Sequence, residues 1–309
     1  MSAECGIVGL VLHFRTPDRT LACLQSLADE GICKVVLVDN SEDAGQSIQA
    51  MQSGLTRLAD AGLRVEVLRP ARNLGFAAGV GMGLERMSKN PGAPVLLINS
   101  DAKLENGALK VMRGPLRNHG LVVPMLARET GQSGASAFAY YQRFAALILR
   151  SAMPGTVAHP SGCCLLIRDD LVRADLFDPD FFFYGEDVML GFDLARRGVE
   201  VVECVDATVI HAGSASAKNG SMFYEYHMVR AHWLLARKLA RHGFERSLFV
   251  AARCVTLPLR ACVRSLRSRS LIPWRGLFAA TADMMRGRCR SFTPPATSSV
   301  AHCVKTARS

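Results

Sequence analysis

Short apolar runs alternate along the chain with segments whose apolar positions recur every three or four residues. The runs cover residues 7–14, 35–38, 65–68, 95–98, 121–123, 163–167 and 199–202. The segments between them include Leu21, Leu24, Leu27 and Ala28, then Leu55, Leu58, Ala59 and Gly62, and later Leu109, Met112 and Leu116. Strand-sized runs separated by amphipathic helices are typical of βαβ units. The pattern therefore predicts an α/β fold with a mostly parallel central sheet.

Residues 127–160 break this rhythm with glycine, serine and aromatic residues. A long irregular insertion beside a cleft often covers a substrate, and the alternative is a loop without such a role. We predict three regions in all. They are a catalytic domain over residues 1–215, a helical and membrane-associating extension over 216–270, and a basic, largely disordered tail over 271–309.

The composition fits a globular protein and gives no signal for a membrane span. With 309 residues, of which 49% are hydrophobic, the chain can bury a substantial core. The mean hydropathy of +0.15 is high, but the first apolar run is only strand-sized, and Glu4 stands where a secretory signal carries positive charge. The ten cysteines lack Cys-x-x-Cys spacing, which favours reduced core residues over a disulfide framework or a zinc site. These features predict a cytoplasmic protein.

The net charge of +10 is concentrated near the C-terminus. Residues 246–309 contain eleven Arg and one Lys against a single acid, Asp283, so they carry +11 and the rest of the chain carries −1. A nucleic-acid enzyme would carry basic residues around its cleft, whereas here they extend from a neutral body, so we expect no nucleic-acid partner. Attraction to an anionic membrane surface is the simpler interpretation.

Several of these basic residues would share one face of a helix. They are Arg246, Arg253, Arg260 and Arg267, spaced seven residues apart, and Arg264. Each Arg would oppose crossing a bilayer by about 2.5–3.5 kcal/mol, and Pro258 is unfavourable inside a helix. We therefore expect a peripheral helix that lies in the plane of the inner face of the cytoplasmic membrane. The alternative is a solvated helix that packs on the catalytic domain.

Two segments could bind a nucleotide. Asp39 follows the run at 35–38 and would hydrogen-bond to a base or ribose, although an acid at this place can simply start a turn. A glycine-rich entry to a helix follows at 72–83 and includes Asn73 and Gly75. Such a segment allows the backbone to approach a phosphate or nucleoside closely, and close helix packing explains it equally well.

The fourth predicted strand ends in Asn99-Ser100-Asp101. This triplet resembles an Asp-x-Asp metal motif whose first acid is Asn99, and Asp101 would hold Mg²⁺ or Mn²⁺ together with the phosphates of a sugar nucleotide. The alternative is a helix N-cap. His211 follows a later apolar strand and would contact the metal or the diphosphate, although a lone histidine is more often a structural or surface residue.

Glu186 and Asp187 open a predicted helix directly after the aromatic run at 181–184. Acids are common in a first helical turn because they offset the helix dipole. In the functional interpretation, Asp187 takes the proton from an attacking acceptor hydroxyl and Glu186 orients the acceptor. Two acidic positions and an imidazole together predict metal-assisted group transfer.

The order of these motifs carries more information than each motif alone. They are Val-Asp-Asn at 38–40, Asn-Leu-Gly-Phe-Ala at 73–77, Leu-Ile-Asn-Ser-Asp at 97–101, Ser-Gly-Cys-Cys-Leu-Leu-Ile-Arg at 161–168, Phe-Phe-Tyr-Gly-Glu-Asp-Val at 182–188 and Ile-His at 210–211. Together they resemble glycosyltransferase family 2 over about residues 6–240. Within that family, the chain is most similar to the bacterial rhamnosyltransferase-like branch that builds surface polysaccharides.

The resemblance implies a GT-A fold, which is a Rossmann-like fold of nucleotide-diphospho-sugar transferases. It implies a nucleotide-diphosphate sugar donor, a divalent cation, and transfer with inversion to a hydroxyl of a glycan or lipid-linked acceptor. Carried over by position, Asp39 contacts the base, Asn73 and Gly75 border the nucleotide, Asp101 holds the metal, and Asp187 is the catalytic base.

Two positions depart from the family pattern. Met189 stands where another acid is usual, and Asp193 where an Arg is frequent, and these departures make a non-catalytic sugar-nucleotide-binding scaffold the alternative function. A dinucleotide-dependent oxidoreductase, suggested by Gly79, Gly81 and Gly83, is disfavoured. Its glycine motif should follow the first strand, and these glycines follow the third.

Overall fold

The centre of the computed structural model, which describes residues 6–89, 92–129, 134–212 and 220–290, is an eight-stranded sheet. The strand order is β3-β2-β1-β4-β10-β6-β11-β5. The strands are β1 (Val8–His13), β2 (Lys34–Asp39), β3 (Arg64–Leu68), β4 (Val95–Asn99), β5 (Ala102–Leu104), β6 (Leu121–Arg128), β10 (Cys164–Ile167) and β11 (Val201–His211). Every apolar run that we predicted as a strand lies in this sheet or overlaps one of its strands.

Strand direction differs between the two halves of the sheet. Strands β3, β2, β1 and β4 are parallel, as predicted, and β6 is parallel to β11. Strand β10 is antiparallel to both β4 and β6, and β5 is antiparallel to β11. The sheet is therefore mixed. The chain reaches β10 from a small neighbouring sheet and not through the crossover helix that a parallel connection requires.

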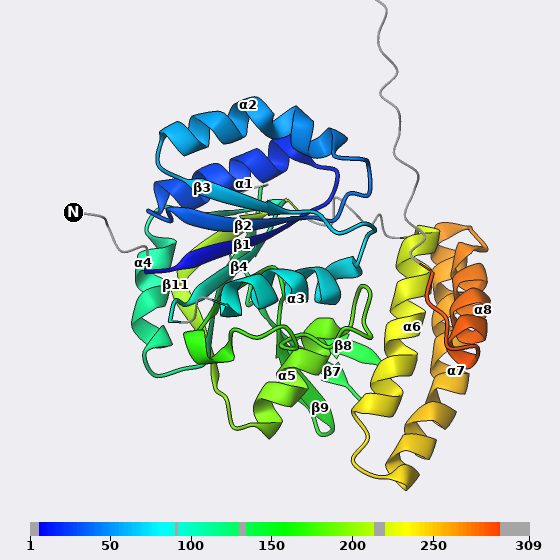
Figure 1. Cartoon of the computed structure of the whole chain (residues 1–309). Coiled ribbons are helices and arrows are strands. Elements are labelled where there is room, and N and C mark those ends of the chain that lie inside the picture. The colour runs from blue at the N-terminus through cyan, green and yellow to red at the C-terminus, as the bar shows by residue number, and fades with distance from the viewer. Residues whose placement is uncertain (1–5, 90–91, 130–133, 213–219, 291–309) are drawn as a thin grey trace, which may run out of the picture.

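Helices cover both faces of the sheet and create two apolar cores (Figure 1). One face is covered by α1 (Pro17–Asp29), α2 (Gln46–Asp60) and α4 (Ala108–Leu116), and the other by α3 (Gly75–Ser88) and α5 (Glu186–Arg196). Burial on both sides explains why the central strands are continuous apolar runs and do not alternate with polar residues. Cys23, Cys163, Cys164 and Cys204 are buried free thiols, as expected of core residues, whereas Cys33 is disulfide-bonded.

The segment predicted as an irregular insertion contains a second, three-stranded antiparallel sheet in the order β8-β7-β9. Its strands are β7 (Phe138–Gln142), β8 (Leu147–Leu149) and β9 (Thr156–Pro160). The prediction is therefore wrong for these residues, because the strands are too short to show a clear alternating pattern. Strand β9 packs against helix α5, which begins with Glu186 and Asp187.

Three helices follow the central sheet at one side of the molecule (Figure 1). They are α6 (Met222–Lys238), α7 (Gly243–Ser268) and α8 (Ile272–Met285), and each packs on the other two. Helix α8 corrects the predicted boundary of the disordered tail, because residues 272–285 are helical and supply Leu277 and Ala280 to a small apolar core. Residues 291–309 of that predicted tail lie outside the described residues. Among the residues described, no helix is long and apolar enough to cross a membrane.

Two arginines of the predicted basic stripe point into the protein. Arg253 is fully buried and donates hydrogen bonds to the backbone carbonyls of Arg143 and Phe144, and Arg264 pairs with Glu225 at 2.6 Å. This part of the helix therefore follows the alternative that the sequence left open, a helix packed on the rest of the protein.

Helix α5 lies unusually close to strand β9 at Gly191. A Cβ atom at this position would overlap the carbonyl oxygen of Ala158 and would lie 2.8 Å from the Cα of His159. The absence of a side chain thus lets the backbones of helix and strand approach each other.

We expect Gly191→Ala to destabilise the protein by about 1–3 kcal/mol, the usual cost of forcing extra atoms into a packed contact. Gly243→Ala is the matched control, because Gly243 also lies in a helix, α7, and apart from its chain neighbours and its own helix backbone nothing lies within 4 Å of the position its Cβ would take. The control should keep or raise the stability. Urea unfolding measures both variants, and equal stability of the two would show that α5 and β9 can separate without cost.

Candidate active site

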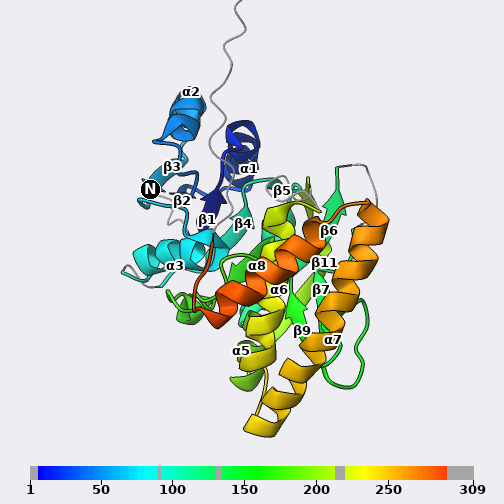
Figure 2. The same cartoon turned by 90° about the vertical axis from the view of Figure 1, so that its right-hand side faces the viewer.

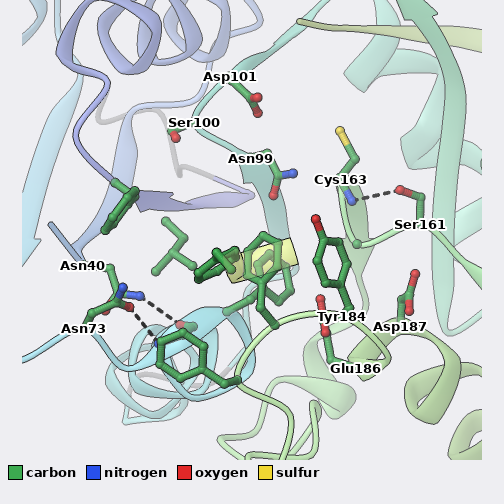
Figure 3. A pocket seen from close by; sticks show the side chains of 18 of the residues that line it. Asn40, Asn73, Asn99, Ser100, Asp101, Ser161, Cys163, Tyr184, Glu186 and Asp187 are labelled. Atoms are coloured by element: carbon green, nitrogen blue, oxygen red, sulfur yellow. Dashed lines mark hydrogen bonds between the residues drawn. The ribbon is translucent and has the colours of Figure 1, made fainter. Parts of the chain in front are cut away.

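Most of the predicted site residues line a cavity of about 250 Å³ (Figure 3). It lies where β1 and β4 end and where helices α3, α5 and α6 begin. The predicted residues that line it are Asn73, Gly75, Asn99, Asp101, Glu186, Asp187 and His211. Asp101 and Asp187 are far apart in the sequence, and the fold brings them to the same cavity.

One wall of the cavity is a loop held by hydrogen bonds from side-chain amides. The Asn40 side chain donates to the carbonyl of Gly75 at 2.9 Å and accepts from the backbone N–H of Leu74 at 2.8 Å. The Asn73 side chain accepts from the N–H of Gly75 at 2.8 Å (Figure 3). These bonds fix the turn that begins helix α3.

Gly75 is required at this turn for two reasons. Its φ of +76° lies in the left-handed region, and a Cβ atom would overlap the carbonyl oxygen of Phe182. The same carbonyl accepts a hydrogen bond from the N–H of Phe76 at 2.7 Å. The loop before α3 is thereby joined to the aromatic segment before α5.

Asp39 does not line the cavity. Its side chain is only 4% exposed, one of its oxygens accepts from the N–H of Ser41 at 3.1 Å, and the other lies 3.6 Å from Nε of Arg69. Asn40, the next residue, lines the cavity instead. Asn40 belongs to the Val-Asp-Asn motif at 38–40, and its amide directly after a strand-ending acid was a usable signal for a site residue.

Asp101 and His211 are brought together by strand pairing. Strand β5 pairs antiparallel with β11, in a register that sets Ala102 opposite His211. Nε2 of His211 lies 3.2 Å from a carboxylate oxygen of Asp101. Burial lowers the pKa of His211, but its contacts with Asp101 and Cys163 outweigh burial and raise this pKa to about 10.

This pair fits a divalent cation as a partial ligand set. A carboxylate oxygen and an imidazole nitrogen that face each other at 3.2 Å are both ligands that Mn²⁺ accepts, and a cation bound between them would displace the proton that His211 otherwise holds. Within the described part of the chain, no group of three or more His, Cys, Asp or Glu side chains could hold a metal ion. A cation here would therefore take its other ligands from water and from substrate phosphates, which is the usual arrangement for Mg²⁺.

Asp187 lies at the start of α5 beside a buried histidine. Its Oδ2 lies 3.3 Å from Nδ1 of His159, and its Oδ1 accepts from the N–H of Val188 at 2.8 Å. Burial raises the pKa of Asp187, but attraction to His159 and the backbone hydrogen bonds outweigh burial and leave it below its ordinary value. Asp187 is therefore ionised at neutral pH, as a general base must be.

Glu186 is in the opposite protonation state. Its Oε2 is buried and has no hydrogen-bond partner among the described residues. Burial, followed by the charge of Asp187, raises the pKa of Glu186 to about 8. Adjacent carboxyl groups whose pKa values are separated in this way can act as proton donor and proton acceptor in one site.

His159 is the site residue that the sequence analysis missed. Its side chain is 4% exposed and lies on β9, in the segment predicted to be irregular. No signal in the sequence placed a histidine 28 positions before Asp187 beside it, because only the packing of α5 on β9 does so.

The family departure at Met189 has a structural explanation. Met189 is 7% exposed, does not line the cavity, and belongs to an apolar cluster with Tyr141, Leu234 and Leu235. It packs α5 against the small sheet and α6. Asp193, the other departure, also lies outside the cavity lining.

Solved structures of glycosyltransferases share this fold. The mannosyltransferase PcManGT from Pyrobaculum calidifontis, in complex with GDP-Man and Mn²⁺, aligns with a TM-score of 0.53 and 14% identity over 93% of this chain and 89% of its own. GalNAc-T7 with UDP, GalNAc and Mn²⁺ aligns with a TM-score of 0.55 and 12% identity, over 93% of this chain and 58% of its own. Residues 1–349 of S. aureus TarS align with a TM-score of 0.50 and 15% identity, over 91% and 92%. The fold is GT-A.

A family model gives the membership. The model described as "Glycosyltransferase like family 2" matches residues 10–236, which is more than half of the chain. A search of curated proteins found no match. The family match, the GT-A fold and the acidic cavity agree with one another, and the chain therefore belongs to glycosyltransferase like family 2.

Proposed function

We propose that this glycosyltransferase inverts the anomeric centre as it moves a sugar from a nucleotide diphosphate to a hydroxyl of a glycan or lipid-linked acceptor. The resemblance to the rhamnosyltransferase-like branch makes rhamnose the first sugar to test and surface polysaccharide the expected product. The observation that carries the proposal is that Asp101, in the turn after β4, and Asp187, in the first turn of α5, line one cavity (Figure 3).

The nucleotide would lie along the loop that Asn40, Asn73 and Gly75 form. Two of the similar structures were solved with GDP-Man or UDP and with Mn²⁺, which supports a nucleotide donor and a divalent cation for this chain. Asp39 remains our proposed contact to the base, and Asn99 our proposed donor contact beside Asp101. A bound Mg²⁺ or Mn²⁺, held by Asp101 and His211, would neutralise negative charge on the departing diphosphate as a Lewis acid.

The transfer step follows from the placement of Asp187. The oxygen of the acceptor hydroxyl attacks the anomeric carbon, its proton passes to the Asp187 carboxylate, and the diphosphate leaves from the opposite face with the bonding electron pair. The attraction of His159 keeps Asp187 ionised for this role. Protonated Glu186 can donate a hydrogen bond to the acceptor and so orient it.

A screen of nucleotide sugars tests the activity directly. The purified chain is incubated with UDP-, dTDP- and GDP-linked sugars, Mn²⁺ and glycan or lipid-linked acceptors, and product formation is followed by mass spectrometry. The non-catalytic scaffold predicts donor binding without hydrolysis or transfer. Packing of Met189 in the core, away from the cavity, removes one of the reasons for that alternative.

We expect Asp187→Asn to lower kcat by about 10²–10⁴, the usual contribution of a general base, because the amide cannot accept the proton. Donor binding, measured by calorimetry, should change little. Asp193→Asn is the control on the same helix, outside the cavity lining. Normal turnover by purified Asp187→Asn would refute the assignment of the base.

His159→Gln tests the electrostatic role of the histidine. Glutamine retains a hydrogen-bonding side chain but no positive charge, so the pKa of Asp187 should rise. The pKa of Asp187 lies below its ordinary value in the unsubstituted protein, so the kcat profile is recorded from about pH 3 to pH 9, and its acid limb should move to higher pH in the variant because Asp187 must be ionised to act. A purely structural role for His159 would lower activity at every pH without moving that limb.

Asp101→Asn tests the cation site. The substitution should weaken Mn²⁺ binding in the presence of UDP or GDP by about tenfold or more, since it removes the only carboxylate of the proposed ligand pair. Calorimetric titration with Mn²⁺ measures this without turnover. Asp206→Asn, at an exposed position of β11, is the control. An unchanged titration for Asp101→Asn would exclude Asp101 as a ligand.

A further inference from the structure

The outward face of helix α7 is apolar along its whole length. The residues on this face are spaced three and four apart and are Phe244, Leu248, Ala251, Val255, Leu259, Cys262 and Leu266. All are exposed, and the exposed fractions of Phe244, Val255 and Leu266 are 77%, 68% and 75%. We call this set of residues the α7 stripe. An exposed apolar stripe of this length on a globular protein marks an interaction surface.

Helix α7 is apolar on its inward side as well as on its outward side. Phe249, Leu257 and Ala261 are buried on the inward side, together with the fully buried Arg253. Apolar packing, the hydrogen bonds of Arg253 and the ion pair of Arg264 with Glu225 thus hold the helix to the protein. The outward side, which is polar in an ordinary surface helix, carries the α7 stripe.

Helix α8 and the β7–β8 hairpin extend the apolar area. On α8 and directly before it, Leu271, Phe278 and Met285 are each more than 60% exposed. Helices α7 and α8 pack on each other and together face the viewer in Figure 2. The hairpin carries exposed Leu147 and Ile148 and is held beside α7 by the hydrogen bond from Arg253 to the carbonyl of Phe144.

Exposed charge on these two helices and the segments that follow them is positive. Arg267, Arg269, Arg275, Arg286 and Arg288 are exposed. The acids of α7 and α8 are Glu245, whose side chain is 17% exposed and pairs with Arg143, and Asp283, which is fully buried. The surface therefore combines apolar side chains with unopposed arginines, and its partner must be apolar in part and negatively charged.

We infer that the outer face of α7 and α8 lies on an anionic lipid bilayer, with the α7 stripe inserted among the acyl chains and the surrounding arginines at the phosphates. Helices with an apolar face and a basic border lie in the membrane interface in this way. A second copy of the chain is a poorer partner, because a symmetric contact would bring the same arginines together. We thus retain the predicted contact with a membrane. The face of α7 that makes it is opposite to the face that carries Arg253 and Arg264 of the predicted basic stripe.

Flotation of the full chain with phospholipid vesicles tests the inference. Vesicles of phosphatidylglycerol and phosphatidylcholine should bind the protein, and vesicles of phosphatidylcholine alone should bind it several-fold more weakly, because each nearby basic residue adds attraction to anionic lipid. The double variant Leu259→Asn/Leu266→Asn should reduce the partition coefficient by about tenfold or more. Val205→Asn is the matched control, since Val205 is 67% exposed but lies on β11.

Three outcomes would overturn the inference. The first is that the full chain fails to bind anionic vesicles, and the second is that the double variant and the control bind equally well. The third is that light scattering shows a dimer of the full chain, that the double variant is a monomer, and that neither binds vesicles. Vesicle binding is measured without donor or acceptor, so the result does not depend on the proposed sugar transfer. An unchanged far-UV circular dichroism spectrum and melting temperature would confirm that the double variant keeps its fold.

Discussion

The close contact between helix α5 and strand β9 determines the arrangement of the acidic side of the site. Gly191 allows the two backbones to approach, and this approach brings His159 within 3.3 Å of Asp187. Contact with the His159 imidazole counteracts the effect of burial on the pKa of Asp187, while neighbouring Glu186 stays protonated. Two adjacent carboxyl groups thus acquire different protonation states from their surroundings, which is what acid–base chemistry at neutral pH requires.

The other side of the site depends on the sheet. The pairing of β5 with β11 sets His211 next to Asp101. The hydrogen bonds of the Asn40 side-chain amide fix the loop around Gly75. The half of the cavity that we propose for the donor is therefore built on the central sheet. The half that we propose for the acceptor is built on α5, which packs on the small antiparallel sheet, and residues of both halves line the cavity.

In the C-terminal helices, arginines make buried contacts with the protein while the apolar α7 stripe stays exposed. Arg253 donates hydrogen bonds to carbonyl groups in the turn after β7, and Arg264 forms an ion pair with Glu225. The side of α7 that carries these two arginines therefore faces the protein. Removing either arginine would leave buried polar groups without partners, and such groups are costly. The helix orientation is thus set by these contacts together with the buried apolar residues Leu257 and Ala261, and the α7 stripe remains available to a membrane.

The sequence by itself determined the α/β class, the positions of the central strands and the order of motifs that identifies the family. These follow from local patterns, since apolar runs form buried strands and acids or glycines follow them at turns. The three-stranded sheet, the antiparallel direction of β10 and helix α8 were decided by pairing and packing between distant segments. The partners of Asp187 and the inward orientation of Arg253 were decided in the same way. Only the tertiary structure could place His159 beside Asp187, because that contact depends on the missing side chain at Gly191 and on a strand too short to be recognised from its own residues.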